Sequence, residues 1–259
     1  MLSYFTELNR KRPPLGIFDF ITHTVCPIVH SADDLSVMET LESLPWIIAS
    51  TRAMIGKLPY HLGPSGIPCR DNPYGARVAT NPNNGRVCLS GMDPRQRGLF
   101  AAAWALGLAS ATSKARLDAI SLGSVTGPQG IVYRKSDYMQ PGFDGSDASV
   151  YPIYHILAGL GGARGTRSIE TVSDAPAKIA SLAHQSKNGP VLWLANLTGN
   201  HQAVKISGFK GKAQLHVIDD KHFNALVRSP DYLTKAGDFV RKIAVLEIGP
   251  YAIIRVSAA

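Results

Sequence analysis

The pattern of apolar segments changes once along this chain, close to Gly162, and that change constrains the fold more than any single motif. Before it, short apolar runs typical of β-strands alternate with segments of helical periodicity. The predicted strands cover residues 4–9, 17–25, 60–67 and 117–122. Long loops follow these strands rather than the helices, a pattern typical of parallel βα units. We therefore expect residues 1–162 to form one domain with four βα units.

Helices are predicted between and after these strands. Their expected extents are residues 36–56, 98–115 and 150–160. Residues 36–39 (Ser-Val-Met-Glu) have the spacing of a capping box, and Pro45 is expected to kink the helix that follows. The loop over residues 68–91 is long and polar, which in a compact domain favours a functional segment.

Beyond Gly162 the segments become short strands separated by Gly, Asn and Pro turns. The predicted strands are residues 191–196, 203–206 and 215–218, together with residues 243–256, which fold back at Gly249-Pro250. Short strands with such turns are typical of an antiparallel β-sandwich. Residues 163–259 are therefore predicted to form a C-terminal β-sandwich domain.

Composition excludes several classes of function. The 259-residue chain has no apolar run near the roughly 20 residues of a membrane span, and its net charge of +8 comes from scattered Lys and Arg residues. We expect a cytoplasmic protein that binds neither nucleic acid nor a membrane. Cys26, Cys69 and Cys88 are odd in number and far apart, which favours idle thiols over disulfides or a metal site. We expect no metal and no cofactor.

Several short stretches together resemble one known family. They are residues 4–10 (YFTELNR), 26–34 (CPIVHSADD), 63–65 (GPS), 70–75 (RDNPYG) and 193–198 (WLANLT). Their order across nearly the whole chain resembles the D-apionate lactonase family. The resemblance implies a hydrolase of bacterial sugar-acid and apiose catabolism, which opens D-apionolactone to D-apionate. It also implies a glycoside-hydrolase-like TIM barrel followed by a β domain.

The resemblance covers only the later part of that architecture. It predicts an α/β plus β fold, in which the second half of a TIM-like (β/α)8 barrel precedes an antiparallel β-sandwich. A half barrel leaves strand edges and apolar surface open. The favoured explanation for the missing half of the barrel is a truncated or wrongly annotated start. The alternatives are an assembly in which a second chain or copy completes the barrel, and a decayed remnant. The expected partners are a small sugar lactone and either the missing N-terminal half or another copy of the chain.

Opening a lactone requires activation of water, stabilisation of an oxyanion and protonation of the leaving alkoxide. Glu7 is the first catalytic candidate, because it follows the first predicted strand, and barrel enzymes place catalytic groups at strand ends. The alternative role for Glu7 is an ion pair with Arg10 or Arg12. His23, near the end of the second predicted strand, and His30, in the next loop, are candidates to hold a lactone oxygen or move a proton. A hydrogen-bonded packing role is the alternative for both histidines.

The candidate substrate-binding residues lie in the same stretches. They are Asn9, Asp33, Ser65, Arg70, Asp71, Asn72 and Tyr74. Arg70 is suited to bind a carboxylate product with two hydrogen bonds. Helix capping is the alternative for Asp33, and a loop held by its own hydrogen bonds is the alternative for residues 70–74. Ser65 lies in Gly-Pro-Ser-Gly-Ile, which does not match the Gly-x-Ser-x-Gly pattern of a nucleophilic serine.

Two other functions are considered. A glycoside hydrolase is the nearest rival, but the predicted strand over residues 60–67 ends without Asp or Glu, and Asp71 is a weak substitute for the second carboxylate of a retaining enzyme. A non-catalytic sugar-binding or interaction remnant is the third possibility.

Overall fold

The computed structural model describes residues 4–241, 243 and 245–259. Ala244, which falls within the strand segment predicted over 243–256, lies outside these residues. Internal contacts group the chain into two compact units. Unit 1 consists of Met1–Gln96 and Ala111–Gly130, and unit 2 consists of Arg97–Ser110 and Ile131–Ala259. The division predicted between residues 162 and 163 stays a prediction.

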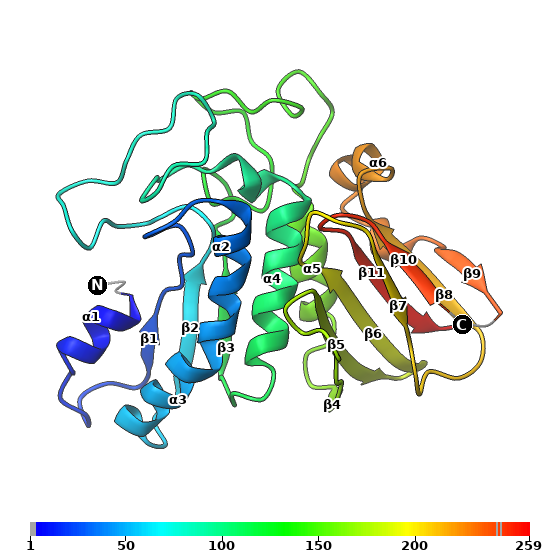
Figure 1. The fold of residues 1–259 in the computed structure, drawn as a ribbon, viewed down its shortest axis with the longest axis horizontal. Coiled ribbons are helices and arrows are strands. Elements are labelled where there is room, and N and C mark those ends of the chain that lie inside the picture. The colour runs from blue at the N-terminus through cyan, green and yellow to red at the C-terminus, as the bar shows by residue number, and fades with distance from the viewer. Residues whose placement is uncertain (1–3, 242, 244) are drawn as a thin grey trace. The chain divides into compact units, whose positions relative to one another are not determined.

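Unit 1 contains a parallel sheet of three strands in the order β1, β2, β3. They span Ile21–His23 (β1), Tyr60–Ser65 (β2) and Ala119–Leu122 (β3), and they lie side by side in Figure 1. β2 and β3 approach closely at Gly63, where an added Cβ would lie 2.4 Å from the Ser121 carbonyl oxygen. Only glycine fits this position, which also has a φ of +133°. The parallel βα pattern predicted for this part of the chain is confirmed for three strands.

The strand predicted over residues 4–9 is wrong, because the segment forms helix α1 (Phe5–Arg10). Tyr4 is its extended N-cap residue and forms a single parallel bridge with Thr24. Glu7 in the first turn and Arg10 in the last complement the helix dipole. Leu8 faces inward and joins a buried cluster whose other members are Ile21, Ile48, Ile55 and Tyr60. The segment therefore buries Leu8 on one face of a helix and does not alternate buried and exposed side chains as a strand does.

The second predicted helix is divided into α2 (Asp34–Glu39), a 3-10 turn (Thr40–Ser43) and α3 (Leu44–Ile55). The predicted capping box is displaced, because Asp33 rather than Ser36 is the N-cap residue of α2. Pro45 lies in the first turn of α3, where its missing N–H costs nothing, so it starts a helix instead of kinking one. α3 ends at Gly56, which has a positive φ.

Unit 2 contains a six-stranded antiparallel sheet in the order β4, β5, β6, β11, β8, β9. These strands span Arg167–Ile169, Ile179–Ser186, Gly189–Asn196, Ile253–Ala258, Ala213–Ile218 and Asp238–Val240, in that order. A separate antiparallel ribbon joins β7 (Gln202–Lys205) to β10 (Val245–Ile248). Apolar residues of the ribbon and of the large sheet share one core, so the two sheets pack face to face. The predicted antiparallel C-terminal β domain is confirmed.

The helices of unit 2 are α4 (Leu99–Thr112), α5 (Ile153–Gly161) and α6 (Phe223–Arg228). A 3-10 turn over Tyr232–Thr234 also lies in unit 2, and a second, Pro94–Arg97, lies at the boundary of the two units in the sequence. α5 packs tightly on β6, since a Cβ on Gly159 would lie 2.4 Å from the Trp193 ring. α4 is joined to β5 by a hydrogen bond of 2.7 Å from the Ser110 hydroxyl to the Ser181 carbonyl.

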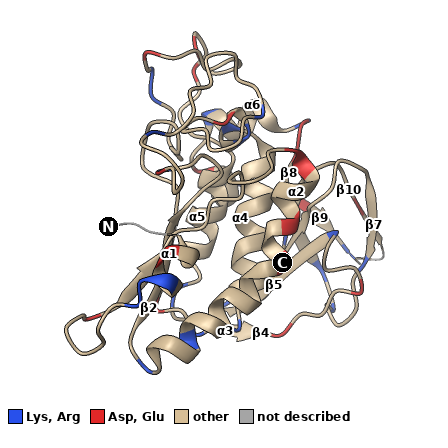
Figure 2. Cartoon of the chain, turned by 60° about the vertical axis from the view of Figure 1, so that its left-hand side comes forward, with Lys and Arg blue, Asp and Glu red and all other residues tan. Residues whose placement is uncertain are grey.

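Charged residues are distributed over many elements. Figure 2 shows Lys and Arg positions on helices, strands and loops alike. Among the residues that the structure describes, no helix is long and apolar enough to cross a membrane.

Candidate functional site

The candidate site lies at the carboxyl-terminal edge of the parallel sheet in unit 1. β1, β2 and β3 run in one direction, so the loops that follow them leave the sheet at the same edge. Ser65, the last residue of β2, joins all three loops. Its hydroxyl accepts a hydrogen bond of 3.1 Å from the Val25 N–H, and its carbonyl accepts one of 2.7 Å from the Gly123 N–H. In barrel enzymes this edge carries the reactive groups.

The same contacts determine the role of Ser65. Its side chain is fully buried, and its hydroxyl is already engaged by backbone. A hydroxyl in this position holds the loops in shape. These contacts fit a structural role for Ser65, and the substrate contact stays a prediction.

His30 and Tyr74 form an exposed pair at this edge. The Tyr74 hydroxyl lies 3.2 Å from His30 Nε2, and the two rings are 5.7 Å apart. His30 belongs to the loop after β1, and Tyr74, which is 63% exposed, belongs to the loop after β2. The structure therefore brings together two predicted site residues that are 44 positions apart in the sequence. An imidazole and a phenol in contact with each other and with solvent are suited to proton transfer and to binding hydroxyl groups.

Arg70 extends from the loop after β2 to the loop after β3. Its guanidinium donates to the Ser124 hydroxyl at 3.0 Å and to the Gly123 carbonyl at 3.3 Å. Partial burial lowers the pKa of Arg70, but a guanidinium keeps its charge at neutral pH. Both of these contacts are to neutral oxygen atoms, so a carboxylate or a developing oxyanion is the charge-complementary ligand for this position.

Asp71 and Asn72 hold the loop in shape. The Asp71 carboxylate accepts from the Asn72 N–H at 2.9 Å, and the Asn72 side chain bonds the Tyr74 N–H and the Arg77 carbonyl. Tyr4 ties the same loop to the start of α1, because its hydroxyl donates to the Asp71 carbonyl at 2.8 Å. The alternative of a loop held by its own hydrogen bonds therefore describes Asp71 and Asn72, whose side chains position Tyr74.

His23 is correctly predicted at the end of a strand, but it is fully buried. Its Nε2 lies 2.6 Å from the Tyr60 hydroxyl, and its Nδ1 lies 3.2 Å from the Thr24 carbonyl. Burial lowers the pKa of His23, so the ring is neutral, with Nδ1 donating to the carbonyl and Nε2 accepting from Tyr60. These contacts fit the packing alternative for His23, and its catalytic role stays a prediction.

Asp33 caps α2. Its carboxylate accepts from the Ser36 N–H at 2.9 Å and from the Ser31 hydroxyl at 2.6 Å, and these hydrogen bonds lower the pKa of Asp33. The neighbouring Asp34 accepts from both Arg86 and Arg95 at 2.7–2.8 Å. Asp33 therefore has the capping role, and the substrate contact predicted for it is not supported by this geometry.

A chain of ion pairs fastens the long loop to α2. Arg95 bonds both Asp34 and the fully buried Asp93, at 2.8 and 2.7 Å, while Arg86 bonds Asp34 from the solvent side. These pairs connect the C-terminal end of the loop to the first turn of α2. The loop that carries Arg70 and Tyr74 is thus anchored at its C-terminal end.

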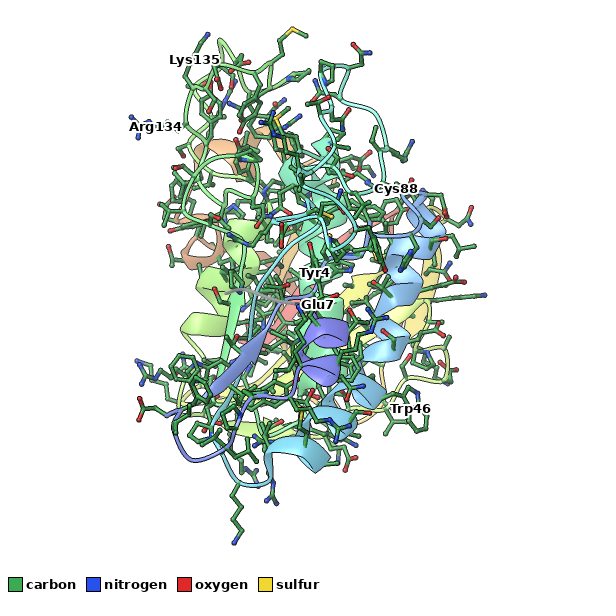
Figure 3. All side chains as sticks on the ribbon, turned by 90° about the vertical axis from the view of Figure 1, so that its left-hand side faces the viewer. Tyr4, Glu7, Trp46, Cys88, Arg134 and Lys135 are labelled. Atoms are coloured by element: carbon green, nitrogen blue, oxygen red, sulfur yellow. The ribbon has the colours of Figure 1, made fainter. Side chains whose placement is uncertain are left out.

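Glu7 and Asn9 lie on α1 rather than at the end of a strand. The Glu7 carboxylate is half-buried and accepts from the Thr6 hydroxyl at 3.0 Å, whereas Arg12 bonds the Asn9 side chain at 3.2 Å. Tyr4 and Glu7 are three residues apart, a spacing that places side chains on one face of a helix, and Figure 3 shows them close together. Glu7 therefore lies near the Tyr4 side chain that contacts the loop after β2.

Comparison with known proteins identifies the family. A model of the TIM barrel domain of D-apionate lactonase matches residues 1–165, and a model of the C-terminal immunoglobulin-like domain of the same enzyme matches residues 176–256. The chain belongs to the D-apionate lactonase family. A D-apionate lactonase from Brucella anthropi is 42% identical over 209 residues, which are 81% of this chain and 33% of that protein. The chain thus spans about one third of the length of this D-apionate lactonase relative.

Solved structures show the same fold at low identity. A bifunctional glucanase-xylanase from a metagenome library is 12% identical with a TM-score of 0.54, over 97% of this chain and 45% of that one. A family 44 xyloglucanase from Paenibacillus polymyxa is 10% identical with a TM-score of 0.53, over 92% of this chain and 46% of that one. The glycoside-hydrolase-like fold expected for a D-apionate lactonase family member is therefore confirmed.

Several residues at the candidate site of this chain were not predicted from the sequence. Tyr4 was read as part of a strand, and Ser124 was not singled out. Gln96 and Gln129 line the loop beneath Gly66, where Gln96 accepts from the Ile67 N–H at 3.2 Å and Gln129 donates to the Pro68 carbonyl at 2.8 Å. No signal in the sequence points to these residues, because their partners are distant backbone atoms. Within the described part of the chain, no three His, Cys, Asp or Glu residues gather as a metal site.

Proposed function

We propose that this chain carries part of the active site of a sugar lactone hydrolase of the D-apionolactone to D-apionate type. One observation carries the proposal: the exposed His30–Tyr74 pair and the Arg70 guanidinium come from loops at one edge of the parallel sheet. Membership of the D-apionate lactonase family supports the substrate class. Water adds to the lactone carbonyl, and the bond from the carbonyl carbon to the ring oxygen breaks to give a hydroxy acid.

In this proposal Glu7 and His30 move protons. One of them accepts a proton from the attacking water, and the other donates a proton to the alkoxide that leaves. Tyr74 holds His30 by their hydrogen bond of 3.2 Å and offers its hydroxyl to the sugar. Asn9, on the exposed side of α1, is a further candidate contact for a sugar hydroxyl.

Arg70 stabilises negative charge in the same reaction. The tetrahedral intermediate carries an oxyanion, and the product carries a carboxylate, so a fixed cation favours both over the neutral substrate. Ser124 and the Gly123 carbonyl orient the guanidinium before substrate binds. Arg70→Lys is therefore expected to weaken product binding, because an ammonium cannot reproduce a two-pronged contact.

We further propose that the three parallel strands are a portion of a complete barrel. A (β/α)8 barrel needs eight strands, and the outer strand β3 exposes Ala119, Ile120 and Ser121. Additional strands, from further chain or from a second molecule, would cover this surface.

A glycosidase is the rival function. No carboxylate stands at the end of β2, and the Asp71 carboxylate is engaged by the Asn72 N–H. Two properly spaced carboxyl groups are needed for glycoside hydrolysis by the usual route. The site therefore favours a lactone over a glycoside.

A substrate panel tests this proposal. The purified chain would be given five-membered sugar lactones and aryl glycosides, and acid release and aryl release would be followed in parallel with calorimetric binding of the sugar acids. We expect the chain to open a lactone or to bind the corresponding sugar acid, and we expect no aryl release. Arg70→Lys should weaken binding of the sugar acid at least tenfold. Cleavage of an aryl glycoside, or neither turnover nor binding of any lactone or sugar acid, would contradict the proposal.

A further inference from the structure

Two cysteine side chains meet at the carboxyl-terminal edge of the sheet. Cys26 and Cys69 are 43 residues apart in the sequence, yet their Sγ atoms lie 3.0 Å apart. Cys26 follows β1 and Cys69 follows β2, so the contact joins the first two loops of the site. The third cysteine, Cys88, is exposed and is labelled separately on a loop in Figure 3.

The surroundings of the pair make its two thiols unequal. The hydrogen bond with Cys26 lowers the pKa of Cys69 against the effect of burial, while the hydrogen bond with Cys69 and burial both raise the pKa of Cys26. The lower pKa makes Cys69 the member of the pair that more readily forms the nucleophilic thiolate, and the Cys26 thiol lies beside it. Cys26 is half-buried and Cys69 is buried, so small reagents reach the pair more easily than large ones.

We propose that Cys26 and Cys69 form a site of reversible two-electron oxidation, which reacts with small hydroperoxides and closes to a disulfide. The Cys69 thiolate attacks one peroxide oxygen and becomes a sulfenic acid, and with hydrogen peroxide the other oxygen leaves as hydroxide, which takes up the proton that Cys69 released and becomes water. Cys26 then attacks the oxidised sulfur, the S–S bond forms, and a second water leaves with the remaining protons. A disulfide is about 2.05 Å long, so the two sulfur atoms need to approach each other by only about 1 Å.

Closure of this bond would cross-link the candidate loops. Residues 70–74 follow Cys69 directly, and the Tyr4 hydroxyl bonds the Asp71 carbonyl. The disulfide would tie this segment to the loop that leads from β1 to His30. The oxidation itself is independent of the proposed lactone chemistry, because its reagents and products involve only the thiols and the peroxide.

Thiol mapping tests the inference on the complete chain. The reduced protein would be treated with hydrogen peroxide, then denatured, alkylated, digested and analysed by mass spectrometry. We expect a linked peptide pair containing Cys26 and Cys69, lighter by two hydrogen atoms than the sum of the reduced peptides, and its loss after treatment with dithiothreitol. Hydrogen exchange of residues 69–77 should be slower in the oxidised form.

The cysteine variants supply the controls. Cys88→Ser is expected to form the linked pair as the wild-type chain does, whereas Cys26→Ala and Cys69→Ala should each abolish it. The wild-type result decides the matter even if one of these variants does not fold. Recovery of Cys26 and Cys69 as alkylated thiols after peroxide treatment, or conversion of either one to a sulfinic acid without a link, would overturn the proposal. None of these outcomes depends on lactone hydrolysis.

Discussion

At the scale of single residues, His23 and His30 differ in burial and therefore in the chemistry that they can perform. Both were predicted as catalytic from residue type and place in the chain. His23 has both ring nitrogens engaged inside the protein, whereas His30 meets Tyr74 at the surface. Sequence alone does not separate the two, because burial depends on distant residues such as Tyr60.

The buried His23 predicts a pH dependence of stability. Burial lowers the pKa of His23 below its ordinary value of about 6.5, so the unfolded chain binds a proton at a higher pH than the folded chain. Its contribution is complete above about pH 6.5 and is lost as pH falls through that value towards the lowered pKa. Urea unfolding at pH 7 and pH 5 should show a smaller decrease for His23→Asn than for the wild type.

An exposed histidine is the matched control for this measurement. His201→Asn should leave the difference between pH 7 and pH 5 close to the wild-type value. Equal pH dependence in the wild type and His23→Asn would show that His23 does not contribute in this range.

The ion pairs around Asp34 give a second residue-scale prediction. Arg95 is 8% exposed and bonds the buried Asp93, so Arg95→Met leaves a buried carboxylate without this guanidinium and should lower the unfolding free energy by about 3–5 kcal/mol. Arg86 is 57% exposed, and Arg86→Met should cost less than about 1 kcal/mol. Urea unfolding of both variants measures the difference. Similar losses in the two variants would contradict the assignment of Arg95 as the anchor.

At the scale of secondary structure, segments with strong patterns were predicted well. β2, β6 and β8 fall within two residues of their predicted bounds, because apolar runs ended by turn residues are clear strand signals. β5 (Ile179–Ser186) was missed, since its Ala, Ser, His and Gln residues carry little strand signal and its pairing with β6 supplies the structure. α1 was misread for a related reason, as tertiary burial of Leu8 outweighed the strand preference of Tyr and Phe.

The contact of α5 with β6 gives a prediction at this scale. A Cβ at Gly159 would lie 2.4 Å from the Trp193 ring, so Gly159→Ala should lower the unfolding free energy by about 1–3 kcal/mol. Gly161, in the same helix, has open space around it, and Gly161→Ala should be neutral or stabilise by up to about 1 kcal/mol. Thermal unfolding of the two variants compares them directly. A Gly159→Ala variant as stable as Gly161→Ala would contradict the close packing.

At the scale of the whole molecule, the order of elements was more informative than any residue. The change from βα units to short strands predicted two kinds of sheet, and both are present. The candidate site was predicted less well, because its contacts join residues far apart in the chain. Arg70 with Ser124, His30 with Tyr74 and Cys26 with Cys69 are examples, and none of these pairs has a sequence signature.

The central proposal is that residues of α1 and of the loops at the edge of the parallel sheet open a lactone, and the rate of sugar lactone hydrolysis by matched variants tests it most directly. Glu7→Gln and His30→Gln should each lower the rate at least about 100-fold, the usual effect of removing a proton-transfer group, with the unfolding free energy unchanged. Glu42→Gln, an exposed substitution outside the site, should keep the wild-type rate. Rates within severalfold of wild type for both Glu7→Gln and His30→Gln would contradict the claim.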